Sequence, residues 1–138
     1  MALQESVAVR NASLDAREVA IGTAPKLLIY TGAAPADCAT AASGTLIAEG
    51  TLPSDWLAAA AAGVKSKLGA WAMAGLPAAG GGATAGYFRL VDSAGTTCHQ
   101  QGSVTISGGG GVMTLDNTSI ANGQSITVNS YDITAGNA

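Results

Sequence analysis

The sequence has few charges, few aromatic side chains and few residues of the types that usually perform chemistry. Charged residues make up 11% of its 138 positions and aromatic residues 4%, and it contains two cysteines and one histidine. The six lysines and arginines are scattered along the chain, and the formal net charge is −3. Because a protein needs several cations on one face to bind a phosphate backbone, we expect no direct binding of nucleic acid.

Long apolar runs are also absent. No stretch approaches the roughly 18 uninterrupted apolar residues of a transmembrane helix, so we expect no membrane span. The start of the chain, Met1–Ser6, lacks the basic residues and apolar run of a secretory signal. Synthesis in a cytoplasm is therefore expected.

The hydrophobic share of the chain, 48%, overstates the side-chain area that it can bury. Much of this share is alanine, and 19 further positions are glycine. A large apolar side chain stabilises a fold by roughly 1.5–3 kcal/mol when it is fully buried. The sequence therefore predicts one folded domain with a light core, which contacts with partners can stabilise further.

Residues 1–24 are typical of an N-terminal arm with a short helix. Asn11 or Ser13 can cap a helix that runs to about Ile21, where Gly22 provides a stop. The apolar stripe of this helix consists of Leu3, Val7, Leu14 and Ile21. The arm packs either on its own domain or on a neighbouring subunit, and only the second alternative is functional.

Residues 25–138 are expected to form a mainly β domain. Roughly seven to nine short strands, separated by glycine-containing turns, predict an antiparallel β-sandwich of jelly-roll type, with a barrel as the related alternative. Tyr87–Val91 is the clearest strand, and Gly32–Gly44 is a long loop. The alanine run in 54–62 suggests one or two helical turns. The apolar pattern of Ser125–Thr134 changes parity, which predicts a β-bulge near Asn129 or a strand buried on both sides.

Cys38 and Cys98 allow two interpretations. A disulfide between them would close a loop of about 60 residues and stabilise the fold. A reducing cytoplasm would instead keep both as buried free thiols that pack as small hydrophobic groups. Two cysteines and one histidine are too few for an ordinary structural zinc site, and we expect no metal and no other cofactor.

No arrangement of residues indicates catalysis. His99 follows Cys98, but successive strand residues point to opposite faces, which argues against a Cys–His dyad. The nine carboxylates show no spacing that suggests a glycosidase pair. Gly108–Gly111 precedes a predicted strand and lacks the lysine of a phosphate-binding loop. We expect no enzyme, and therefore no catalytic or cofactor-binding residues.

Trp56 and Trp71 are the remaining candidate functional residues. Tryptophan is frequent in protein cores and also at interface hot spots. The two residues are therefore either core residues or candidate interface anchors that fill a pocket of a partner.

Several segments of the chain, in order, resemble small virion proteins of tailed bacteriophages and prophages. These segments are Val9–Asn11, Thr31–Cys38, Leu52–Trp56, Gly86–Leu90, Gly95–His99, Met113–Thr118 and Thr134–Ala138. The nearest functional resemblance is to the cement, or decoration, proteins of short-tailed phage capsids. It implies a small β-sandwich that dimerises on the outer capsid surface and bridges subunits of the major capsid protein.

The resemblance also implies a location and partners. The protein would be made in the host cytoplasm and end in the virion, with the major capsid protein and a second copy of itself as partners. A tail or tail-fibre component that binds a receptor such as a host glycan is the alternative, and exposed aromatic side chains on loops would favour it. A small hydrolase, the third alternative, would lose turnover on His99→Ala.

Overall fold

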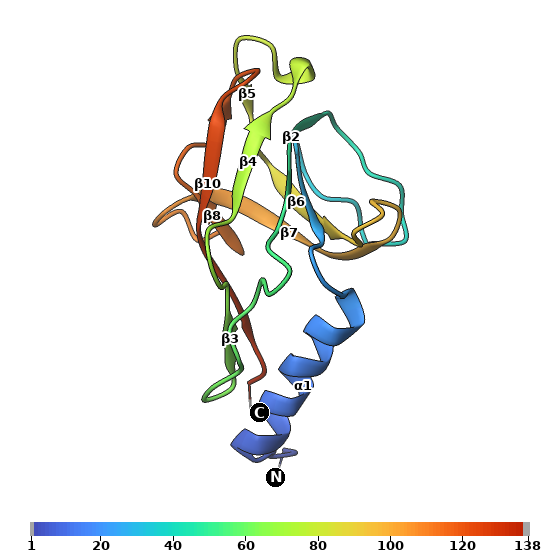
Figure 1. Ribbon diagram of the computed structural model, residues 1–138, viewed down its shortest axis with the longest axis vertical. Helices are drawn as coiled ribbons and strands as arrows, with labels where there is room; N and C mark the ends of the chain where they lie inside the picture. Colours follow the sequence, from blue (N-terminus) through green and yellow to red (C-terminus); the bar gives the residue numbers. More distant parts are fainter. Residues whose placement is uncertain (1, 137–138) are drawn as a thin grey trace.

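A computed structural model describes residues 2–136 as one α-helix, one 3-10 turn and ten strands (Figure 1). The elements are α1 (Val7–Ile21), β1 (Lys26–Tyr30), β2 (Leu46–Thr51), β3 (Val64–Ser66), β4 (Ala72–Gly75), η1 (Pro77–Ala79), β5 (Ala83–Thr84), β6 (Tyr87–Val91), β7 (Cys98–Ile106), β8 (Met113–Leu115), β9 (Ser119–Ile120) and β10 (Ser125–Thr134). The mainly β prediction is confirmed.

Seven strands close into a barrel. Their order is β10-β4-β2-β1-β6-β7-β8, and β8 pairs with β10 again to complete the ring. Neighbouring strands are antiparallel except β7 and β8, which are parallel. The expected jelly-roll sandwich would consist of two sheets, whereas here one sheet curls on itself and leaves no free edge in the ring.

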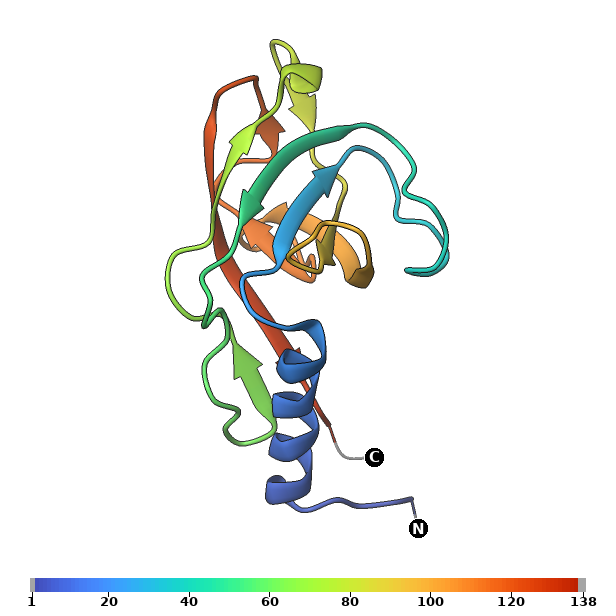
Figure 2. The same ribbon diagram turned by 45° about the vertical axis from the view of Figure 1, so that its right-hand side comes forward.

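The longest strand, β10, continues below the barrel (Figure 2). Its last residues, Asp132–Thr134, pair with β3, beside α1. We call α1, residues 53–70 and the end of β10 the helix lobe. The register of β10 against β8 shifts between Val128 and Ser130, so the predicted bulge near Asn129 is confirmed. This shift lets Val128 and Tyr131 both face the core.

The helix α1 begins earlier than the sequence predicts. Its N-cap is Ser6, whose Oγ accepts a hydrogen bond of 3.3 Å from the backbone N–H of Val9. Asn11 and Ser13 lie inside the helix, so the prediction that one of them caps it is wrong. Gly22 ends the helix as predicted.

The apolar stripe predicted for this helix is only half buried. Leu14 and Ile21 are 0% and 8% exposed and belong to the core, whereas Leu3 and Val7 are 78% and 46% exposed. Leu3 lies before the helix and Val7 lies in its first turn, at the end of α1 that is far from the barrel (Figure 1). In this chain the arm therefore packs on its own domain, with its buried apolar contacts at Leu14 and Ile21.

The alanine run after Trp56 is extended, so the helical turns expected there are absent. Leu57 bridges to Lys67, and Ala61 bridges to Val64, which folds this segment back on β3. Ala62 and Gly63 form the tight turn, with φ of 53° and 76°. A helix this short is marginal by itself, and pairing with β3 satisfies the same backbone groups.

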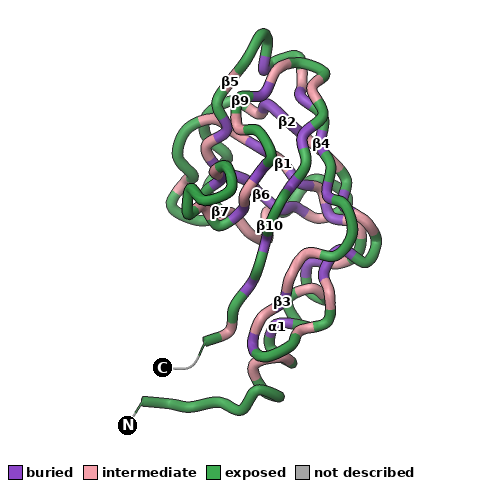
Figure 3. The backbone as a smooth tube through the Cα atoms, turned by 90° about the vertical axis from the view of Figure 1, so that its left-hand side faces the viewer, coloured by how far each residue is buried: buried purple, intermediate pink, exposed green. Residues whose placement is uncertain are grey.

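The core extends from the barrel into the helix lobe. Exposed residues are concentrated in the loops and in the segment before α1 (Figure 3). A chain of aromatic contacts connects the two parts. Ring centroids lie 5.8 Å apart for Trp56 and Trp71, 5.3 Å for Trp71 and Tyr131, and 5.6 Å for Phe88 and Tyr131. These large rings fill volume that alanine and glycine leave open.

Candidate interaction surface on the N-terminal helix

The side of α1 that points directly away from the core is apolar, and the exposed polar residues Ser13, Asp15 and Arg17 flank it. Its residues, which we call the outer face of α1, are Ala8, Val9, Ala12, Ala16, Val19 and Ala20. All are exposed, Val9 by 51% and Val19 by 81%. At about 100° per residue they fall on the side of the helix opposite Leu14 and Ile21.

Arg10, Asn11, Asp15 and Glu18 of α1 instead contact the rest of the helix lobe. Asn11 Oδ1 accepts a hydrogen bond of 2.9 Å from the N–H of Gly63. Arg10 Nη1 donates one of 3.2 Å to the carbonyl of Ala135. The outer face of α1 therefore carries no charge, whereas the face of an ordinary surface helix opposite the core is charged or polar.

Lys65 on β3 is the centre of these inward contacts. Its side chain is 2% exposed, and its Nζ lies 2.6 Å from Asp15 Oδ1 and 2.8 Å from Glu18 Oε2. Burial by itself would lower the pKa of Lys65, but the hydrogen bonds with Asp15 and Glu18 outweigh it and the pKa is raised. The hydrogen bond from Lys65, followed by one from the N–H of Ala60, lowers the pKa of Asp15. Lys65 therefore stays charged and holds α1 against β3.

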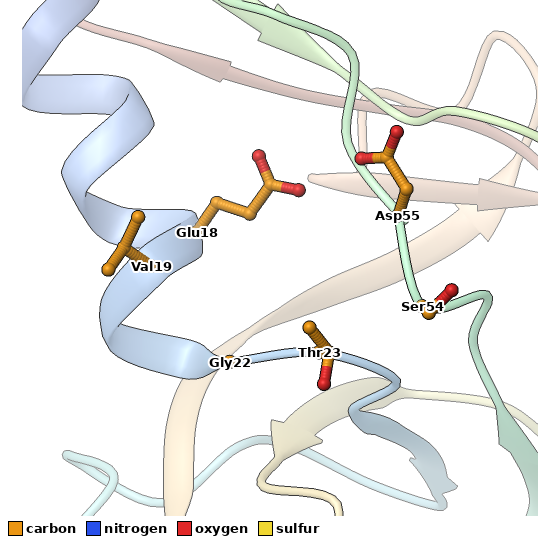
Figure 4. A pocket seen from close by; sticks show the side chains of 6 residues that line it. All are labelled: Glu18, Val19, Gly22, Thr23, Ser54 and Asp55. Carbon is orange, nitrogen blue, oxygen red and sulfur yellow. The ribbon is translucent and has the colours of Figure 1, made fainter.

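A shallow cavity of about 440 Å³ lies where α1 ends, opposite the segment after β2 (Figure 4). It is lined by Glu18, Val19, Gly22, Thr23, Ser54 and Asp55. Figure 4 shows the carboxylates of Glu18 and Asp55 facing each other from opposite walls. Since Glu18 is paired with Lys65 and Val19 also belongs to the outer face of α1, the cavity is an extension of that apolar surface rather than a separate reactive site.

Trp56 and Trp71, the candidate interface anchors, are both 0% exposed. Trp71 Nε1 donates to the carbonyl of Trp56 at 3.1 Å, and Trp56 Nε1 donates to the carbonyl of Gly22 at 3.0 Å. The structure thus places both in the core, with no indole surface for a partner. Trp56 acts instead within the chain, because its hydrogen bond fastens the end of α1.

His99 lies beside α1, at a second cavity that is separate from the one lined by Glu18 and Asp55. It lines a cavity of about 290 Å³ together with Arg17, Ala20, Ile21 and Gln100. Its neighbour Cys98 turns the other way, toward Cys38, as the alternation of strand residues predicts. The structure brings neither a carboxylate nor a hydroxyl group to this cavity, so the lining offers the imidazole no partner of a catalytic triad.

The part of the chain that the structure describes has no group of three or more histidine, cysteine, aspartate or glutamate residues placed to hold a metal ion. Among residues 2–136 there is also no helix long and apolar enough to span a membrane.

The aromatic side chains are not arranged as a binding surface. Trp56, Trp71, Tyr87, Phe88 and Tyr131 are buried. Tyr30 is half-buried and stacks on Tyr87 with ring centroids 5.1 Å apart. The loops of residues 2–136 thus present none of the exposed aromatic rings that would favour a glycan-binding protein.

Comparison with protein families, with curated proteins and with solved structures finds no match for this chain. Its function is therefore inferred from its own geometry, in which the outer face of α1 is an exposed apolar surface.

Proposed function

We propose that this chain is a structural protein of a bacteriophage virion, a cement protein that binds the outer capsid shell and bridges subunits of the major capsid protein. The observation that carries the proposal is the outer face of α1. Four of the seven large hydrophobic side chains that are exposed in residues 2–136 lie on α1 or just before it: Val9 and Val19 on the outer face itself, and Leu3 and Val7 near the start of the helix. Exposed apolar side chains concentrated on one element are typical of an interaction surface.

The fold supports a bridging role because it joins a rigid body to a projecting helix. The closed barrel provides the body, and Lys65 and Trp56 fix the direction of α1 relative to it. When the outer face of α1 packs on one shell subunit, the barrel lies over the next. No reacting group is needed for this function.

A cement protein of this kind needs only moderate affinity at each site. If two copies associate, as the resemblance implies, each dimer carries two helices, and the second contact forms at a high effective concentration. Binding to the assembled shell alone then stabilises that shell by mass action.

The alternative, a tail or tail-fibre protein that binds a host glycan, has less support. Its expected signature is a cluster of exposed aromatic side chains, and in residues 2–136 these side chains are buried or half-buried. A tail component that uses the outer face of α1 to bind another virion protein would have the same surface, so the location in the particle decides between the two.

The proposal is tested by adding purified protein to expanded capsids that lack it. We expect the protein to sediment with the capsids, to saturate at a fixed ratio to the major capsid protein, and to raise the temperature at which the capsids release DNA. Protein that stays in the supernatant at saturating concentrations would contradict the proposal.

A further inference from the structure

The two cysteines of the chain meet, although they lie 60 positions apart in the sequence. Cys38 lies in the loop between β1 and β2, and Cys98 is the first residue of β7. Their Sγ atoms are 2.7 Å apart, and both residues are half-buried free thiols. Both cysteines are thus free thiols, as one of the two interpretations expects, but they are half-buried rather than buried and their sulfur atoms are in contact.

The loop that carries Cys38 is held in place independently of its sulfur atom. Side chains of β6 and β7 bind backbone carbonyls on both sides of Cys38: Arg89 Nη2 to Thr40 at 2.7 Å, Gln101 Nε2 to Pro35 at 2.8 Å, and Tyr87 Oη to Ser43 at 2.6 Å. Arg89 is only 6% exposed, so its guanidinium group has few other partners than this loop and Gln101. The fold itself thus brings the two sulfur atoms together, and a bond between them requires little rearrangement.

We propose that Cys38 and Cys98 form a reversible disulfide, a modification site that locks the β1–β2 loop onto β7 when the protein leaves a reducing compartment. The proposal is independent of the proposed function, since it depends only on the two thiols and on the loop that holds them. It names a disulfide oxidant, such as oxidised glutathione, as the co-reactant.

The reaction with oxidised glutathione proceeds by two exchanges. The Cys38 thiolate attacks one sulfur of oxidised glutathione, which forms a mixed disulfide and releases one glutathione thiolate. The sulfur of Cys98 then attacks Cys38 Sγ, loses its proton to water, and releases the second glutathione thiolate. Two protein thiols are oxidised to one disulfide, and one oxidised glutathione is reduced to two glutathione molecules.

The environment of Cys98 supports this order of events. Burial, followed by the hydrogen bond with Cys38, raises the pKa of the Cys98 thiol to about 12. Cys98 thus keeps its proton at neutral pH and is a poor nucleophile toward the external oxidant. The resolving exchange is within the molecule, so contact between the sulfur atoms compensates for the small thiolate fraction of Cys98.

The disulfide is expected to stabilise the protein mainly by restricting the unfolded chain. A closed loop of about 60 residues predicts a rise in melting temperature of roughly 5–15 °C. The folded state changes little, because the loop already occupies the required position.

The test equilibrates the full chain with oxidised or reduced glutathione, blocks free thiols with an alkylating agent, and measures intact and peptide masses together with the melting temperature. We expect the oxidised protein to lose two hydrogens, to take up no alkyl group, to yield a Cys38–Cys98 crosslinked peptide, and to melt at a higher temperature until dithiothreitol is added. The matched variants Cys38→Ser and Cys98→Ser should fold, and their melting temperatures should not respond to dithiothreitol.

Three results would overturn the proposal. They are two alkylated thiols per chain after oxidation, a stable adduct with one glutathione, and a crosslink between chains instead of within one. If the serine variants fail to fold, the masses and the dithiothreitol response of the natural chain still decide the outcome.

Discussion

At the scale of single residues, the position of α1 depends on a lysine that the composition would place at the surface. In the sequence Lys65 is one of six scattered cations, and nothing near it predicts that it is only 2% exposed. Lysine is almost never fully buried without a partner, and here Asp15 and Glu18 supply two. They lie three positions apart on α1, a spacing that places them on one face. The spacing of the two carboxylates indicates that they can bind one cation together. It does not identify Lys65 as that cation, because β3 is far from α1 along the chain.

The pKa of Asp15 predicts acid sensitivity of the helix lobe. A carboxylate whose pKa is lowered in the folded state stabilises the fold above its unfolded pKa, and this contribution is lost as pH falls through the folded value. The free energy of unfolding should therefore decline below about pH 4. In Asp15→Asn the decline should be smaller, while Glu18 still pairs with Lys65.

Urea unfolding of both proteins between neutral pH and pH about 3 measures this effect. Asp37 and Asp92 also have a lowered pKa, the first through hydrogen bonds from Thr40 and the second through the backbone N–H of Thr96. A part of the acid sensitivity should hence remain in the variant. An identical pH dependence in the two proteins would show that the Asp15–Lys65 contact does not contribute.

At the scale of elements, sequence patterns identify the end of α1 more reliably than its beginning. Gly22 ends the helix as predicted, since a glycine can adopt its φ of 93° without strain. The beginning differs from the prediction because Asn11 is a good N-cap in isolation but binds Gly63 in the fold. The bulge in β10 is predictable because a change of parity within one strand requires an extra residue unless both faces of the strand are buried.

The outer face of α1 is harder to predict from the sequence. The apolar stripe of an amphipathic helix is normally its buried side, so the pattern identifies Leu14 and Ile21 but not the alanines. Ala8, Ala12, Ala16 and Ala20 recur at every fourth position, which is the signal that could reveal the surface. Such a pattern shows that the alanines share one face of the helix, but it does not show whether the rest of the fold buries that face.

A single charge on this face should weaken binding without affecting the fold. Ala16 lies near the middle of the outer face, and Ala16→Lys places an ammonium group where a partner would pack. Because lysine is a good helix former, the melting temperature should change little. We expect affinity for capsids to fall at least about tenfold, the result of losing about 1.4 kcal/mol at the interface.

Ile106→Lys is the matched control for this variant. Ile106 is 54% exposed at the end of β7 and does not belong to the outer face of α1. It should bind as the natural chain does in the same sedimentation assay. Equal binding by both variants would mean that α1 is not the docking element, and equal loss would mean that added positive charge alone disturbs binding.

At the scale of the whole molecule, composition predicts the class of the fold but not its closure. Short strands and frequent glycines indicate a mainly β domain with a light core, and residues 2–136 form one. The ring closes through the parallel β7–β8 pair and through β8–β10, contacts that local patterns do not specify. It also requires a close backbone approach at Gly86, where a Cβ atom would lie 1.9 Å from the carbonyl oxygen of Gly32. A glycine in the sequence is compatible with such a close approach, but the sequence does not indicate which segment of backbone lies against it.

The distribution of polar and apolar surface over the molecule supports a protein that holds others together. Asp15 and Glu18 of α1 pair with Lys65 of the same chain, the aromatic rings of residues 2–136 are buried or half-buried, and four of the seven exposed large hydrophobic side chains lie on α1 or just before it. A light core of this kind gains from contacts that form only in an assembly.

The most direct test of the proposed function is electron microscopy of virus particles produced with the gene for this chain present, compared with particles produced after its deletion. We predict difference density on the outer capsid surface that fits the barrel and the helix lobe, with the outer face of α1 against the shell. Density at the tail instead, or identical maps for the two kinds of particle, would contradict the assignment as a capsid cement protein.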